Sequence, residues 1–303
     1  MRKQLFVFGF IVFLLLGSVS LARAETVVRT FYSEAEFRAY ALARIEELLA
    51  QIETLQAILE SRRQIGAFES FIIKDSADVV ARYQTDRAGT VGNSLHKIYW
   101  DRFLTLTPDA YDDYFDEFVV FDNARSNIDS FVETLPPYQG GSWRFGLGTT
   151  AFDIDLTSPT LDELLVHEFG HVVSYEDIPG LAVPGTLTCH EYFTERFDCP
   201  EDSTYLAVFV DRFWNNSALN YALRTSRLRD PSAAVTAYYE DHESSFVSDY
   251  AASAPEEDFA ETFASFVLQD RPVKNTTADQ KIKFFYRYPK LVSLRSEIRQ
   301  QIE

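Results

Sequence analysis

The chain has 303 residues, of which 46% are hydrophobic and 15% aromatic, so it can bury a sizeable core and is not disordered throughout. It contains 46 Asp and Glu residues against 28 Lys and Arg residues, which gives a formal net charge of −18. Nucleic-acid binding and docking on anionic lipid both require a basic face, so this balance argues against both. The sequence predicts a folded, acidic protein.

Residues 1–24 are predicted to be a signal peptide. A basic start (residues 1–3) precedes an apolar run over 5–16, and Ala22-Arg23-Ala24 fits an A-x-A cleavage site. The apolar run is short for a membrane span, so we expect cleavage and export, to a secreted or extracytoplasmic location, with no membrane attachment afterwards. An uncleaved N-terminal anchor is the alternative.

Residues 25–65 are predicted to form an amphipathic helical arm. Ser33 and Glu36 fit a capping box, and no Gly or Pro interrupts the segment 33–63. Apolar residues at alternating spacings of three and four form a stripe along it: Ile45, Leu48, Ile52, Leu55 and Leu59. A stripe of two heptads is compatible with packing of the arm on its own domain and with self-association through residues 33–63. Both alternatives stay open.

Residues 66–303 are predicted to form one α+β domain. The apolar run 118–121 ends in Asp122-Asn123 and predicts a strand, and residues 143–148 and 152–156 predict two more. Helical patterns cover 160–174, pieces of 203–226, 255–269 and the C-terminus.

The two cysteines, Cys189 and Cys199, lie ten residues apart. In an exported protein this favours one local disulfide. A metal pair or a reactive thiol is the alternative, but no C-x-x-C spacing or further cysteine supports either.

The candidate catalytic residues lie in the segment His167-Glu168-Phe169-Gly170-His171. Pro159 and a capping box at Thr160 and Glu163 predict the start of its helix. Histidines four residues apart lie on one helix face, so their imidazoles can converge on one Zn²⁺. Glu168 can then act as the general base on a metal-bound water without being a ligand. The alternative is a pair of core-facing histidines on an ordinary helix.

A catalytic zinc site needs a third protein ligand. The metzincin pattern would place a histidine where the chain has Asp177, so that pattern fails. A helix opening at Pro255 instead carries Glu257 and Glu261 one turn apart. One carboxylate of such a pair can bind the metal while the other accepts a proton from a ligand imidazole. Acidic residues that only complement the helix dipole are the alternative.

The His167–His171 motif, followed by Tyr250-x6-Glu257-Asp258-Phe259-Ala260-Glu261-x-Phe263, resembles the catalytic domain of anthrax lethal factor-like zinc metallopeptidases, which are gluzincins. The resemblance covers 160–175 and 245–300, more loosely 95–155, and 176–245 looks like an insertion. It implies a zincin-like domain, with a small mixed sheet over the HExxH helix and a mostly helical C-terminal part. It also implies that Glu257 is the third ligand, that Glu261 is the partner of a ligand imidazole, and that Tyr250 donates to the developing oxyanion. His242 is an alternative oxyanion donor.

By analogy with zincins, strand 143–148 is expected to be the edge strand that pairs with an extended substrate, with Trp143, Phe145 and Leu147 on it. The expected protein is a secreted zinc metalloendopeptidase with one Zn²⁺ per chain and a peptide or protein substrate. The alternatives are a non-catalytic zinc-containing binding module and an interaction protein that works through its N-terminal helix.

Overall fold

The computed structural model describes residues 45, 79–85, 91–124, 128–135, 142–181, 190–196 and 200–302. The chain divides into two units, residues 1–65 and 66–303, and the account below concerns the second. The predicted signal peptide, the arm apart from Ile45, and both cysteines lie outside the described residues. Within the described ranges, no helix is long and apolar enough to cross a membrane.

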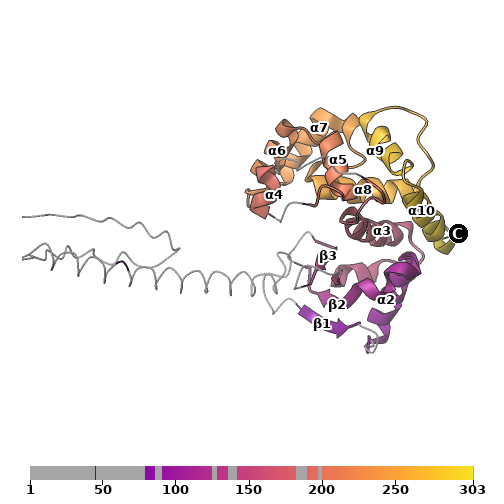
Figure 1. Cartoon of the computed structure of the whole chain (residues 1–303). Helices are drawn as coiled ribbons and strands as arrows, with labels where there is room; N and C mark the ends of the chain where they lie inside the picture. The colour runs from indigo at the N-terminus through magenta and orange to yellow at the C-terminus, as the bar shows by residue number, and fades with distance from the viewer. Residues whose placement is uncertain are drawn as a thin grey trace, which may run out of the picture. The chain divides into compact units, whose positions relative to one another are not determined.

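The second unit is an α+β fold in which a small mixed sheet and α2 are followed by a series of helices (Figure 1). In chain order the elements are β1 (Val79–Gln84), α2 (Ser94–Leu106), η2 (Asp109–Tyr114), β2 (Phe115–Phe121), β3 (Ser130–Thr134), β4 (Trp143–Gly148), η3 (Thr149–Asp153), α3 (Pro159–Ser174), α4 (Glu191–Arg196), α5 (Tyr205–Phe213), α6 (Asn216–Ser226), α7 (Ser232–His242), η4 (Glu243–Ser245), η5 (Tyr250–Ala252), α8 (Pro255–Leu268), α9 (Thr277–Phe285) and α10 (Pro289–Ile302), where η marks a 3-10 helix. The predicted strands at 118–121 and 143–148 and the predicted helices at 160–174 and 255–269 are confirmed.

The sheet has the strand order β1-β2-β4-β3. β2 and β4 are parallel, whereas β1 pairs with β2 and β3 with β4 in antiparallel fashion. One face packs on α2, where the Phe103 and Phe145 rings stack with centroids 4.0 Å apart. On the other face, the Phe131 ring fills the space over Gly146, where a Cβ would lie 2.0 Å from Phe131 Cε1. The glycine therefore allows this cross-strand contact.

Two strand predictions are wrong. β4 lies between β2 and β3 and is not an edge strand, so Trp143, Phe145 and Leu147 do not offer a free backbone edge, and all three side chains are buried. The order of strands in a sheet depends on long-range pairing, which the local pattern does not contain. The strand expected at 152–156 is also absent, because the described chain there turns through η3 and a following loop.

Helix α3 begins at Pro159, and its N-cap is Ser158, whose side chain accepts a hydrogen bond from the Thr160 N–H. The capping box predicted at Thr160 therefore lies two residues too late, because a proline at the first helical position needs no N–H partner and leaves the capping role to the residue before it. The predicted end at Ser174 is correct.

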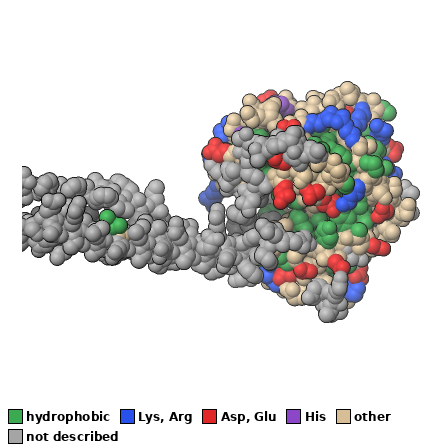
Figure 2. Space-filling view, in the orientation of Figure 1, with side chains coloured by type: hydrophobic (Ala, Val, Ile, Leu, Met, Phe, Trp, Pro, Cys, Tyr) green, Lys and Arg blue, Asp and Glu red, His purple; other side chains and the backbone are tan. Residues whose placement is uncertain are grey.

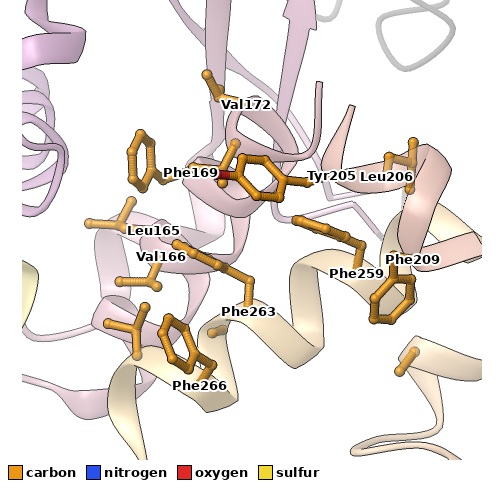
Figure 3. Close-up of a cluster of buried hydrophobic side chains, with 14 of the residues drawn as sticks. Leu165, Val166, Phe169, Val172, Tyr205, Leu206, Phe209, Phe259, Phe263 and Phe266 are labelled. Carbon is orange, nitrogen blue, oxygen red and sulfur yellow. The ribbon is translucent and has the colours of Figure 1, made fainter. Parts of the chain in front are cut away.

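Helix α3 lies between the sheet and the C-terminal helices and packs closely on α8 (Figure 1). Figure 3 shows their apolar side chains interlocking with those of α5: Leu165, Val166, Phe169 and Val172 of α3, Phe259, Phe263 and Phe266 of α8, and Tyr205, Leu206 and Phe209 of α5. At Gly170 the helices approach so closely that a Cβ would lie 3.1 Å from Ala260 Cα. This approach brings the acidic first turn of α8 beside the two histidines of α3.

Candidate metal centre

Three potential metal ligands converge where α3 meets α8. The Nε2 atoms of His167 and His171 lie 3.1 Å apart. Glu257 Oε2 lies 3.3 Å from the first and 3.4 Å from the second. We call His167, His171 and Glu257 the donor triad. In the described part of the chain it is the one group of three or more His, Cys, Asp or Glu residues that could hold a metal ion.

The donor triad fits a tetrahedral zinc ion. Zinc binds imidazole nitrogen and carboxylate oxygen at about 2.0–2.2 Å, so two ligands of a tetrahedron lie about 3.3–3.6 Å apart. The three observed separations are close to this spacing. Glu257 Oε2 is buried, and the nitrogens that face it are His167 Nε2 at 3.3 Å and His171 Nε2 at 3.4 Å. A metal ion bound between these three atoms would compensate the buried charge of the Glu257 carboxylate.

Glu261 lies behind the donor triad. Its Oε1 is 2.8 Å from His167 Nδ1, the ring nitrogen opposite the one that faces Glu257. Ser248 Oγ donates to the second oxygen, Oε2, at 2.7 Å. A carboxylate on Nδ1 keeps the proton there and leaves the Nε2 lone pair for a metal. Of the two glutamates, Glu257 is thus the one beside both Nε2 atoms.

Glu168 is buried, 4% exposed, and its two oxygens differ. Oε1 accepts a hydrogen bond of 2.6 Å from Ser130 Oγ on β3, whereas Oε2 has no hydrogen-bond partner in the described ranges. Burial raises the pKa of Glu168, an effect that His167 and His171 oppose. A buried carboxylate with a raised pKa is well suited to accept and return a proton.

Tyr250, the first residue of η5, approaches the same place, with its ring centroid 5.8 Å from that of His167. Tyr250 is 53% exposed, yet its hydroxyl interacts with the Glu257 carboxylate. The charge of Glu257, followed by burial and the charge of Glu168, raises the pKa of Tyr250 well above 10.0. Tyr250 therefore keeps its proton and remains a hydrogen-bond donor. The alternative donor, His242, is exposed, stacks on Tyr238 and bonds to the Tyr238 carbonyl through Nδ1.

Burial alone would lower the pKa of His167, but the Glu257 and Glu261 carboxylates raise it to about 10. Burial would likewise raise the pKa of Glu257, but the two imidazoles hold it well below its usual range. The site without a metal is thus a set of buried, strongly coupled charges. Perturbation of this kind is typical of functional sites, although structural ion pairs also produce it.

Further contacts fix the residues on either side of Glu257. The carboxylate of Asp258 accepts a hydrogen bond of 2.8 Å from Trp214 Nε1 and lies 2.6 Å from Lys281 Nζ, and all three side chains are buried. On the other side, the Tyr192 hydroxyl donates to Glu256 Oε1 at 2.6 Å. These partners, together with Ser130 and Ser248, could not be identified from the sequence, because no spacing links residues so far apart in the chain.

Acidic side chains are spread over the face in Figure 2, with basic side chains between them, in keeping with the net charge. In comparisons with known proteins, no family model matches the chain, and no curated protein or solved structure matches it either.

Proposed function

We propose that this chain is an exported, zinc-dependent metallopeptidase similar to the gluzincins. One observation carries the proposal: His167 Nε2, His171 Nε2 and Glu257 Oε2 converge at zinc spacing where α3 meets α8. The buried Glu168 follows His167 on α3, and its charge interacts with both histidines. A zinc site that serves structure alone needs no general base. The presence of Glu168 next to the donor triad thus favours catalysis over a structural role.

His167, His171 and Glu257 would hold the ion, and Glu261 would keep the proton on His167 Nδ1. Zinc, when bound, acts as a Lewis acid that activates water and polarises the scissile carbonyl. Glu168 takes a proton from the attacking water through Oε2 and passes it to the nitrogen of the leaving amine. Tyr250 donates its hydroxyl proton in a hydrogen bond to the oxygen that becomes negative, without losing that proton. The net reaction consumes one water and yields a carboxylate and an amine.

The substrate we propose is an extended peptide. Within the described residues, β3 pairs with β4 alone, and its first residue, Ser130, contacts Glu168. A strand with one free backbone edge can pair with an extended chain through main-chain hydrogen bonds. β3 therefore takes the role that the sequence analysis gave to residues 143–148.

The test combines zinc content and turnover in the purified full chain. After dialysis we expect one zinc per chain in the wild type, loss of zinc in Glu257→Ala, and weakened binding in Glu261→Ala. Glu168→Gln is expected to keep its zinc and to lose turnover of a quenched-fluorescence peptide library by about 10²-fold or more.

A wild-type chain that binds no zinc, even after reconstitution, would contradict the proposal. Full peptidase activity in Glu168→Gln would contradict the assigned base. Stoichiometric zinc without turnover of any peptide would instead favour the alternative, a non-catalytic zinc-containing binding module.

A further inference from the structure

Ser130, on β3, contacts Glu168, the proposed general base. Its Oγ–H donates to Glu168 Oε1 at 2.6 Å, and both side chains are buried, at 9% and 4% exposure. This length falls in the range of about 2.5–2.7 Å that is typical of a hydroxyl bonded to a carboxylate, which is a strong type of hydrogen bond. The two residues lie 38 positions apart in the chain, so the contact depends on how β3 and α3 pack together.

The backbone around Ser130 is held firmly in place. Ser130 pairs with Leu147 in the β3–β4 ladder, and the Gly148 N–H donates to the carbonyl of residue 129 at 2.8 Å. The Asn123 amide donates to the Ile128 carbonyl at 3.0 Å and lies over Gly148, where a Cβ would come within 2.5 Å of it. The hydroxyl thus projects from a fixed point on the edge strand toward α3.

This contact makes the two oxygens of Glu168 unequal. Oε1 is engaged by Ser130, while Oε2 has no hydrogen-bond partner within the described part of the chain. We propose that Ser130 is a positioning residue for Glu168, and that its hydroxyl holds the carboxylate so that Oε2 is the oxygen that exchanges a proton with the attacking water. This inference rests on the proposed function. The proton passes from water to Oε2 and then to the leaving nitrogen, while Ser130 keeps its own proton throughout.

A positioning role and a purely structural role predict different kinetics. Loss of an interaction that matters only in the transition state lowers kcat and kcat/KM together and leaves KM unchanged. Loss of a structural hydrogen bond lowers the temperature of unfolding but leaves the kcat of the folded molecules unchanged. Measuring how the substitution changes kcat and how it changes KM therefore distinguishes the two roles.

The first experiment measures zinc content, kcat and KM of the full chain in the wild type, Ser130→Ala, Ser130→Thr and a control, Thr107→Val. The control also removes a buried hydroxyl, one that donates to the Phe103 carbonyl on α2. We expect Ser130→Ala to lower kcat about tenfold or more, with KM within about twofold and zinc content unchanged, since a hydrogen bond to a charged group is lost. Ser130→Thr keeps a hydroxyl and should recover most of the rate, and Thr107→Val should match the wild type. A wild-type kcat in Ser130→Ala would overturn the inference.

The second experiment needs neither zinc nor turnover. Thermal unfolding of the metal-free chain is compared for the wild type, Ser130→Ala, Glu168→Ala and the double variant. If the hydrogen bond exists, the loss in the double variant is smaller than the sum of the two single losses. Additive losses would overturn the inference. Non-additive losses together with a zinc-loaded wild type that turns over no peptide would contradict the proposed function and leave the hydrogen bond itself established.

Discussion

Helix α3 and the first turn of α8 meet at the same site, but they are held there in different ways. His167 and His171 are separated by one turn of a single helix, so their relative position follows from helix geometry. Glu257 owes its position to the contact with α3 at Gly170 and to neighbours bound by distant side chains. The positions of His167 and His171 are therefore determined locally, whereas the position of Glu257 depends on the tertiary structure. Disturbing the C-terminal helices should therefore displace Glu257 before the histidines.

The largest effect is expected from Lys281→Met, a substitution on α9 that changes the surroundings of Glu257. Lys281 lies 2.6 Å from Asp258 in a fully buried ion pair, so its removal leaves an uncompensated buried carboxylate next to Glu257. The expected loss is about 3–5 kcal/mol in the free energy of unfolding, measured by denaturant titration. Adding Asp258→Asn to the same chain removes the second charge and should recover a large part of that loss. An equal loss in the double variant would show that packing, and not the unpaired charge, is responsible.

Tyr192→Phe tests the other neighbour of Glu257 with a smaller change. The variant removes the hydroxyl that donates to Glu256, and a hydrogen bond to a charged group is worth about 1.5–3 kcal/mol. Stability and zinc affinity should both fall. Tyr205→Phe is a matched control, because the buried Tyr205 hydroxyl has no hydrogen-bond partner among the described residues. Equal effects in the two variants would contradict the role assigned to Tyr192.

Gly170→Ala tests the approach of the two helices directly. The added Cβ would lie 3.1 Å from Ala260 Cα and 3.2 Å from Phe263 Cδ1, so α8 must shift by a few tenths of an ångström. Alanine favours a helix over glycine by about 1 kcal/mol, and overpacking costs about 1–3 kcal/mol, so the net loss of stability is at most about 2 kcal/mol. Zinc affinity should fall nevertheless, because Glu257 moves with α8. Gly92→Ala, at a position with open space around it, should leave both quantities unchanged.

For a change of one pH unit, the expected effect is the smallest, about 1.4 kcal/mol in the free energy of zinc binding, and it concerns His167 on α3. Zinc binds neutral imidazole, whereas the pKa of His167 in the metal-free protein is raised to about 10, so binding must release a proton. Zinc affinity, measured by competition with a chelator, should therefore rise about tenfold per unit between about pH 7 and pH 9. The stability of the metal-free protein should change in the opposite direction and fall as the pH rises. The stabilisation that His167 contributes is complete below its unfolded pKa of about 6.5 and disappears as the pH rises through about 10. A zinc affinity that does not change with pH would contradict this account.

The α3 half of the site could be predicted from the sequence because its information is local. The spacing of His167 and His171, the adjacent Glu168 and the helix 160–174 all belong to one short segment. The role of Glu257 rested on the resemblance of a second segment, and the structure brings that residue to the histidines. Strand order and the identity of the edge strand could not be predicted, since β4 is inserted between β2 and β3 by pairing across the chain.

The roles of Ser130 and Lys281 could not be predicted from the sequence for the same reason. Ser130 lies on β3, a strand that the sequence analysis did not predict, and its partner is 38 residues away. Lys281 is a lysine on a short helix, and lysine is usually exposed, so only the structure reveals that it is buried against Asp258. In both cases the polar group is explained by its partner and not by its sequence context.

The three acidic residues in the first turn of α8 carry the same charge but cannot replace one another. The three residues are consecutive, yet each has a different partner. Glu256 accepts a hydrogen bond from Tyr192, Glu257 belongs to the donor triad, and Asp258 pairs with Lys281. Exchanging the last two, as Glu257→Asp with Asp258→Glu, leaves composition, net charge and isoelectric point untouched and changes the reach of each carboxylate by one methylene. A search for distant relatives should therefore score these positions one by one, by side-chain length as well as charge, since a profile that only counts acids would accept chains in which this site cannot assemble.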